Sequence, residues 1–294
     1  MGEKKTFSIV DLYLLMAMVI WGSDFLFAKI ALREVSPMSF AAMRTLISTA
    51  VIFPFFLIQE KDRFVPLRHL IGLGGLALLG TFINRIFWSI GLNLTTASNS
   101  ALIGATSPIF VLIASFVVFR TEVTLRATLG IFLSFLGIIL VIQGEGEGWA
   151  LSSQTFQGDL LIIGAAIVWA LFTVLAKPLL KEYSSLKVTT YVMLLSTLFF
   201  LPYLPNEKGG GWWEISGWAW FSVLYVAILG NGLAYFLWVV GIQRIGPLRT
   251  ILYQYLMPVT AIFCAVPFLQ ETLTALQIGG AAVVFGGIFL ARSG

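Results

Sequence analysis

The chain has 294 residues, of which 59% are hydrophobic and 11% charged, and its mean hydropathy is +0.94. Soluble domains are nearer half apolar and a quarter charged, so this composition excludes a soluble globular protein. The net charge of +4 forms no basic stripe of the kind that binds nucleic acid, and the single Cys264 excludes a disulfide framework.

Ten apolar segments follow one another along the chain. A bilayer core of about 30 Å needs about 20 apolar residues in a helix. Segments close to this length lie near 12–31, 37–58, 70–92, 97–119, 125–143, 159–178, 188–205, 217–240, 248–269 and 273–291. The first is longer than a signal-peptide core and lacks a cleavage pattern, so we expect an uncleaved helix.

The predicted fold is therefore an all-α integral membrane protein with ten transmembrane helices. Residues 1–143 form a first unit of five helices, 144–158 an external linker, and 159–294 a second unit of five. If the N-terminus is cytoplasmic, thirteen Lys and Arg residues fall on its side, and only Lys29, Arg33 and Lys208 on the other. The positive-inside rule then places both termini in the cytoplasm of a multi-pass protein of the cell (inner) membrane.

The two halves of the sequence resemble each other. A shift of 148 positions over residues 11–34 gives eight identities, including Trp21/Trp169 and Lys29/Lys177. A shift of 150 pairs Gly80/Gly230, Trp88/Trp238 and Pro108/Pro258. Five spans is an odd number, so the second half enters from the opposite face, which gives the inverted repeat of secondary transporters.

With these features the chain resembles the drug/metabolite transporter superfamily, whose members carry two five-helix EamA-type repeats. The segment WGSDFLFAK (residues 21–29) and the richness in aromatic residues are similar to YddG-type amino-acid exporters. The resemblance implies alternating access around a central cavity lined by both repeats. It implies amino acids and related amphiphilic metabolites as the exported cargo.

Three ionisable residues are predicted at a similar depth in three different helices. At 1.5 Å per residue, Asp24, Arg44 and Arg85 lie about 12, 10 and 8 Å below the outer face. Charges at this depth need a partner or a wet cavity. We expect Asp24 to neutralise Arg85, with Arg44 competing. The three form either a structural ion pair or a group that meets the charge of a substrate.

Tryptophans mark the second group of candidate site residues. Trp21 and Trp169 lie near the predicted midplane rather than at the interfaces where Trp is usual. Either they pack in the core or they form a cavity wall that stacks on substrate, and we favour the wall. Trp88 and Trp238 lie closer to the two faces. Their position is at least as compatible with an interfacial role as with a role in the site.

Polar residues in the same helices complete the candidate site. Helical spacing joins Asn84 to Trp88, and Asn231 to Tyr235 and Trp238. Asn99, Tyr253 and Gln254 add polar groups to the fourth and ninth spans. Such amides can instead form hydrogen bonds between helices. Pro108 and Pro258 remove equivalent backbone hydrogen bonds and predict kinks that serve gating or packing.

Motifs for other functions are missing from the sequence. No GxxxxGK[ST] is present for ATP, and His69 is the only histidine, so we expect neither a metal nor a cofactor. The sequence shows no nucleophile paired with an activating base, so we do not expect an enzyme. The alternatives are a broad drug or nucleotide-sugar transporter, which should need more basic residues, and a receptor or scaffold. The expected partners are the small-molecule substrate and the lipid bilayer, with the chain as a monomer or weak homodimer.

Overall fold

A computed structural model of the chain describes residues 8–119, 124–143, 153–203 and 214–292. The first half contains α1 (Ile9–Ala31), α2 (Pro37–Gln59), α3 (Leu67–Ala77), η1 (Leu78–Ile83), α4 (Asn84–Leu94), α5 (Ala97–Gly104), α6 (Ser107–Phe119) and α7 (Leu125–Gln143). The second half contains α8 (Gln154–Leu179), α9 (Ser185–Phe200), η2 (Leu201–Tyr203), α10 (Gly217–Tyr225), η4 (Val226–Ala234), α11 (Tyr235–Ile245), α12 (Pro247–Thr250), η5 (Ile251–Tyr255), α13 (Leu256–Leu269) and α14 (Ala275–Arg292).

These elements occupy the ten predicted spans. Eight helical segments are long and apolar enough to cross a membrane, and two shorter apolar helices, Thr128–Gln143 and Ala275–Gly287, fill the fifth and tenth positions. The third and eighth spans each run through a π-helical segment, η1 and η4. Helix α8 begins at Gln154, inside the predicted linker, of which residues 144–152 lie outside the described part of the chain.

Hydroxyl side chains begin six of the spans. Each accepts a hydrogen bond from the backbone N–H three residues further on, which satisfies a donor that the helix itself leaves free. These N-cap residues are Ser8, Ser36, Thr96, Ser153, Ser184 and Ser216. The helix starts are therefore fixed by local sequence, next to the membrane faces.

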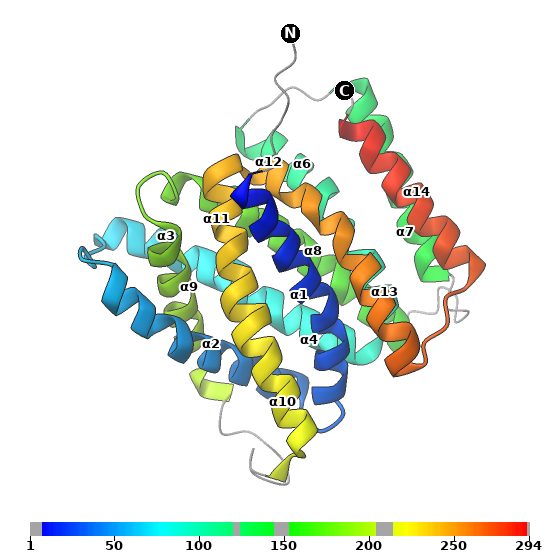
Figure 1. The fold of residues 1–294 in the computed structure, drawn as a ribbon. Coiled ribbons are helices and arrows are strands. Elements are labelled where there is room, and N and C mark those ends of the chain that lie inside the picture. Colours follow the sequence, from blue (N-terminus) through cyan, green and yellow to red (C-terminus); the bar gives the residue numbers. More distant parts are fainter. Residues whose placement is uncertain (1–7, 120–123, 144–152, 204–213, 293–294) are drawn as a thin grey trace.

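The helix contacts repeat under exchange of the two halves (Figure 1). Helix α1 packs against α13 and against the α10–η4–α11 span, while its repeat mate α8 packs against α6 and against the η1–α4 span. Helix α2 packs against α9, and α7 packs against α14. This two-repeat arrangement places α1 and α8 at the centre of the molecule.

Helices α7 and α14 approach closely through small residues. A Cβ added at Gly137 would lie 2.7 Å from the Gly280 carbonyl oxygen, and one at Gly287 would lie 2.4 Å from Ser134 Oγ. On α14 the contacting glycines are Gly280 and Gly287, whereas Cβ atoms added at the neighbouring Gly279 and Gly286 would meet nothing within 4 Å.

Polar seams join the two halves at each end of the molecule. At the end that carries the termini, Lys187 Nζ donates to the carbonyl oxygens of Asp62 and Phe64 at 2.8 Å each, and His69 Nδ1 lies 2.6 Å from Tyr183 Oη. At the opposite end, Ser216 N and Oγ donate to Glu34 at 2.7 and 2.6 Å. These hydrogen bonds hold the pKa of the Glu34 carboxyl below its usual value.

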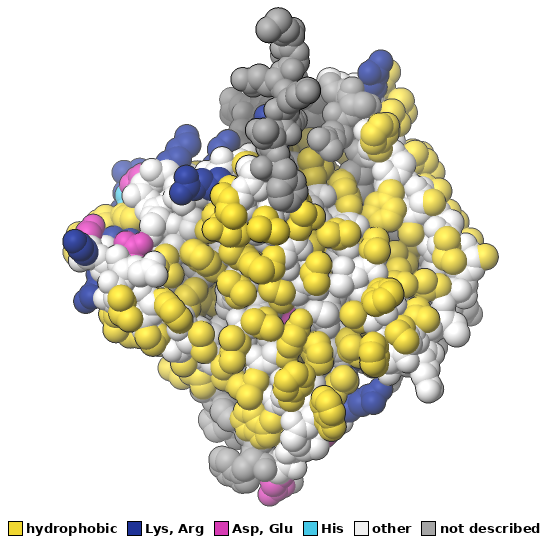
Figure 2. Space-filling view, in the orientation of Figure 1, with side chains coloured by type: hydrophobic (Ala, Val, Ile, Leu, Met, Phe, Trp, Pro, Cys, Tyr) yellow, Lys and Arg dark blue, Asp and Glu magenta, His cyan; other side chains and the backbone are white. Residues whose placement is uncertain are grey.

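Apolar side chains cover most of the visible face of the molecule (Figure 2), whereas most of the Lys and Arg side chains in view gather toward the end that carries the termini. Phe132, Phe263 and Phe289 are among the most exposed large apolar side chains of the described residues. Such a surface requires an apolar surrounding, and the protein is a multi-pass membrane protein.

Candidate functional site

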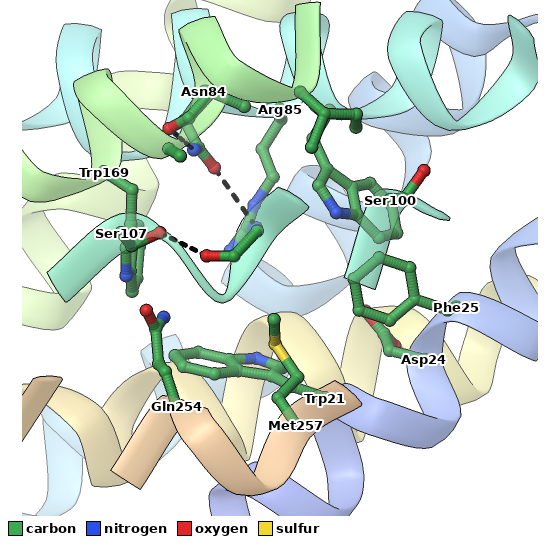
Figure 3. Close-up of a pocket in the computed structure, with 15 residues that line it drawn as sticks. Trp21, Asp24, Phe25, Asn84, Arg85, Ser100, Ser107, Trp169, Gln254 and Met257 are labelled. Carbon is green, nitrogen blue, oxygen red and sulfur yellow. Dashed lines mark hydrogen bonds between the residues drawn. The ribbon is translucent and has the colours of Figure 1, made fainter. Parts of the chain in front are cut away.

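A pocket is lined by residues of both halves. Helix α1, η5 and α13 line one side, and α4, α5, α6 and α8 line the other (Figure 3). The empty space between the lining residues is about 570 Å³, a figure that includes the part open to solvent. The lining residues are Trp21, Asp24, Phe25, Asn84, Arg85, Trp88, Ser100, Gly104, Ser107, Ile162, Ala165, Ala166, Trp169, Gln254 and Met257.

The pocket is displaced toward the end opposite the termini. It is lined by the later part of α1, by α4, and by the first turns of α5, all of which lie nearer that end. On the other side of Trp21, the Tyr253 hydroxyl donates to Asp11, and Gly241 packs against Leu14. These contacts close α1 against its neighbours between the pocket and the end that carries the termini.

Two π-helical segments position the polar groups of the site. η1 ends directly before Asn84 and Arg85, and η4 contains Asn231. A π-helical turn inserts an extra residue and redirects the side chains that follow, and it recurs at functional sites. Each segment also contains a glycine, Gly80 or Gly230, that lets α8 or α1 approach closely. The sequence analysis missed both segments, although it paired these glycines.

Asp24, Arg44 and Arg85 come together, but the ion pair differs from the one predicted. Arg44 Nη2 lies 3.3 Å from Asp24 Oδ2, and both side chains are buried. Arg85 instead donates from Nε to Asn231 Oδ1 at 3.0 Å and from Nη1 to Asn84 Oδ1 at 3.4 Å. The predicted similar depth of the three residues agrees with their contact in the structure. The partner of the Asp24 carboxylate, however, is Arg44 and not Arg85.

Further polar residues hold this cluster in place. Asn231 Nδ2 donates to Ser48 Oγ at 2.9 Å, and Ser48 Oγ in turn lies 2.7 Å from the Ala227 carbonyl oxygen. The guanidinium carbon of Arg44 is 4.9 Å from the centroid of the Trp88 ring, a cation–π distance. Asn231 therefore links α2 to Arg85 from behind the pocket.

Three tryptophans form one cluster beside the charged residues. The ring centroids of Trp21 and Trp169 are 5.4 Å apart, and Trp238 lies 5.3 Å from Trp21 and 5.7 Å from Trp169. Trp21 and Trp169 line the pocket, while Trp238 is fully buried behind them. The sequence analysis expected Trp21 and Trp169 near the midplane, either packed in the core or in a cavity wall. In the structure they contact each other and both line the pocket.

The other predicted residues are divided between the pocket and its surroundings. Asn84, Trp88 and Gln254 line the pocket. Tyr235 lies behind it, with its ring centroid 5.9 Å from the Arg85 guanidinium carbon. Away from the pocket, Asn99 donates to Asp159 Oδ1 at 2.6 Å. Tyr253 binds Asp11 near the end that carries the termini. Asn99 and Tyr253 thus connect helices at the two ends.

Both predicted kink positions follow a change in helix geometry. Pro108 is the second residue of α6, directly after the interruption at residues 105–106 that separates α5 from α6. Pro258 is the third residue of α13, after the 3₁₀ segment η5. A proline in the first turn removes an N–H that would be free in any case, so both prolines suit the start of a new helical segment.

Several lining residues were missed by the sequence analysis. Ser100, Gly104 and Ser107 recur at i, i+4 and i+7, which is the spacing of one helix face, and this small polar stripe could have indicated them. Phe25 and Met257 carry no such signal within an apolar helix. Among the described residues no group of three His, Cys, Asp or Glu side chains could hold a metal ion.

Comparison with known proteins gives the family. The model of the EamA-like transporter family matches residues 8–143 and again residues 156–293. The chain belongs to this EamA-like transporter family. Membership makes the protein a two-repeat membrane transporter and confirms the resemblance seen in the sequence.

Relatives of this EamA protein align over nearly its full length. An "Uncharacterized transporter" from Archaeoglobus fulgidus is 29% identical over 284 residues, covering 96% of this chain and 97% of that relative. A "Probable amino-acid metabolite efflux pump" from Salmonella typhimurium is 26% identical over 286 residues, covering 94% and 92%. A solved structure described as "Crystal structure of protein" shares the fold with a TM-score of 0.72 at 18% identity, over 98% of both chains.

The two EamA repeats differ at the site itself. Under the 148-residue shift Asp24 corresponds to Phe172. A Cβ added at Gly230 would meet Asp24 Oδ1 at 2.4 Å, and one at Gly80 would meet the Phe172 ring at 2.3 Å. Trp21 Nε1 donates to the Gly230 carbonyl oxygen at 2.8 Å. Trp169 Nε1 is buried and finds no hydrogen-bond acceptor within the described residues. The repeats therefore share their packing but not their polar groups.

Proposed function

We propose that the protein is a secondary transporter that exports amino acids, aromatic and other apolar ones favoured, and related small metabolites across the cytoplasmic membrane. The observation that carries this proposal is the composition of the pocket. Trp21, Trp88 and Trp169 offer faces for an apolar or aromatic side chain, and Arg85 offers donors for a carboxylate. The name of the Salmonella typhimurium relative supports the same cargo.

The mechanism we propose is alternating access. The repeats, with boundaries at 1–143 and 159–294, rock against each other, and α6 and α13 bend next to Pro108 and Pro258. With both termini in the cytoplasm, a pocket displaced away from them corresponds to the outward-facing state. The seam of Lys187 with Asp62 and Phe64 then belongs to the closed cytoplasmic side. The transporting unit is a monomer or a weak homodimer.

Counterflow in proteoliposomes that contain only this protein tests the proposal. Vesicles loaded with unlabelled phenylalanine or alanine should accumulate the same labelled amino acid, and empty liposomes should not. Trp169→Ala removes a stacking surface worth about 1 kcal/mol beyond burial, so phenylalanine exchange should fall about fivefold more than alanine exchange. Trp218→Ala, at an exposed tryptophan, is the matched control. Wild-type vesicles that exchange neither amino acid would exclude this function.

The cytoplasmic placement of both termini has its own test. A periplasmic alkaline phosphatase reporter at the C-terminus should be inactive, and a fluorescent protein that matures only in the cytoplasm should be bright, because the basic residues gather at that end. Fusions after Asn93, at the far end of α4, are the opposite-face control. An active phosphatase at the C-terminus would reverse the orientation and convert the open face of the pocket into the cytoplasmic one.

A further inference from the structure

The charges in and beside the pocket do not balance. One carboxylate, Asp24, faces two guanidinium groups, Arg44 and Arg85, and the three side chains are 3%, 1% and 7% exposed. Of the described residues that line the pocket, only Asp24 carries a negative charge. The ionised cluster therefore has a net charge of +1. An uncompensated charge at membrane depth is costly, so the site favours a ligand that brings one negative charge.

Arg85 is the member of the cluster that can receive this charge. Arg44 is committed to Asp24 and does not line the pocket, whereas Arg85 does. Two Arg85 nitrogens, Nε and Nη1, are occupied by the asparagine oxygens of Asn231 and Asn84. Its Nη2 is buried with no hydrogen-bond partner in the described chain. Figure 3 shows Arg85 reaching into the pocket above Trp21.

A second free donor lies next to Arg85. Trp169 Nε1 is buried in the pocket wall and is not bonded to any described residue. The guanidinium carbon of Arg85 is 5.9 Å from the Trp169 ring centroid. The equivalent indole N–H of Trp21 donates to the Gly230 carbonyl oxygen. One repeat thus leaves an indole donor free beside a guanidinium donor.

We propose that Arg85 Nη2 and Trp169 Nε1 form a carboxylate-binding subsite, and that the carboxylate, not the ammonium, is the group by which substrates are recognised. This inference rests on the proposed transport through the same pocket, but it extends the substrate class. Apolar and aromatic carboxylic acids without an amino group are substrates, while the corresponding amines are not. The single carboxylate of an acid without an amino group cancels the net charge of the cluster, whereas a phosphate dianion would exceed it.

Four ligands with the same phenyl group separate these roles. They are phenylalanine, 3-phenylpropionate (no ammonium), phenylalaninamide (no carboxylate) and phenethylamine (ammonium alone). Binding to the purified full-length protein in detergent is measured by isothermal titration calorimetry. Phenylalanine and 3-phenylpropionate should bind, and the other two at least about tenfold more weakly, because they lack the charge-assisted hydrogen bonds.

Variants assign the effect to the two donors. Arg85→Gln should weaken the two acids at least about tenfold and remove the preference over phenethylamine. Arg85→Lys should keep the preference. Arg68→Gln, at an exposed arginine outside the pocket, should change nothing. Trp169→Phe retains an aromatic ring, although a smaller one than indole, removes the N–H, and should weaken the acids more than the amines. It tests the subsite independently if Arg85→Gln does not fold.

The outcomes separate the subsite from the transport function. Amino acids that bind and exchange with no dependence on the carboxylate or on Arg85 would overturn the subsite and leave the exporter proposal standing. Binding of 3-phenylpropionate without exchange of any amino acid would support the subsite and overturn amino-acid export. Equal or stronger binding of phenethylamine, or binding of none of the four compounds, would overturn the subsite.

Discussion

At the scale of single residues, the buried pair of Asp24 and Arg44 has a direct energetic consequence. Removing one partner of such a pair leaves a charge in an apolar surrounding, which costs about 3–5 kcal/mol. Asp24→Asn or Arg44→Gln alone should therefore destabilise the protein strongly, and the double variant should lose much less than the sum. Thermal unfolding in detergent measures the three variants. The same cycle with Arg85→Gln in place of Arg44→Gln is the comparison and should be closer to additive.

The repeat mates Trp21 and Trp169 give a second residue-scale prediction. Trp21→Phe leaves the buried Gly230 carbonyl oxygen without the indole donor and should cost about 1–3 kcal/mol of stability. Trp169→Phe removes an N–H that has no acceptor in the described residues, so it should cost less, or stabilise the protein. Chemical unfolding of the two variants checks this order. A larger loss for Trp169→Phe would mean that its N–H has an acceptor in the absence of substrate.

At the scale of elements, the π-helical segments depend on glycines that face the central helices. A Cβ at Gly230 would lie 2.4 Å from Asp24 Oδ1, so Gly230→Ala must displace the carboxylate that binds Arg44. Overpacking of this kind costs about 1–3 kcal/mol. Gly80→Ala meets the Phe172 ring and should cost a similar amount while it leaves the ion pair intact.

Gly74→Ala is the matched control for these glycine variants. Its added Cβ meets nothing within 4 Å in α3, and alanine favours a helix, so its melting temperature should be unchanged or higher. Melting temperatures and phenylalanine counterflow are measured together. If Gly230→Ala changed the melting temperature no more than Gly74→Ala does, η4 and α1 would be packed less closely than the structure shows.

At the scale of the whole molecule, the polar seam at the end with the termini should control which face is open. Lys187 Nζ donates to two carbonyl oxygens of the first repeat and lies 3.4 Å from Asp62 Oδ2. Lys187→Met removes these bonds and should shift the population toward opening at this end. Spin labels at Lys61→Cys and Lys181→Cys, in a Cys264→Ser background, should then report longer distances by electron–electron double resonance. Arg68→Met, on the same face, should leave the distance distribution as in the parent.

Much of this organisation could be predicted from the sequence. Apolar length located the ten spans, and residue counting placed Asp24, Arg44 and Arg85 at one depth. Counting fixes height along the membrane normal, but not which helix face a side chain occupies. For this reason it could not decide between Arg44 and Arg85 as the partner of Asp24. The contact between Trp21 and Trp169 could not be predicted either, because the internal symmetry of the sequence does not set the distance between two equivalent residues.

The π-helical segments were less accessible from sequence. An extra residue in a helical turn leaves the apolar composition of the third and eighth spans unchanged, and Gly80 or Gly230 alone is compatible with an ordinary helix. The segments are defined by what packs on them, namely Phe172 and Asp24 from the central helices. Such tertiary contacts are absent from local sequence patterns. The sequence analysis therefore selected Asn231 and Arg85 but could not predict the hydrogen bond between them.

In the alternating access that we propose, the exchange of Asp24 for Phe172 between the repeats makes the two access states chemically unequal. A transporter with perfectly equivalent halves would present the same free-energy profile to cargo arriving from either side of the membrane. Here the carboxylate lies in one half alone, so we expect different dissociation constants at the two faces. By detailed balance this asymmetry cannot drive net flux. It sets the concentrations at which each face saturates, and so determines how steeply the proposed efflux responds when cargo accumulates inside the cell.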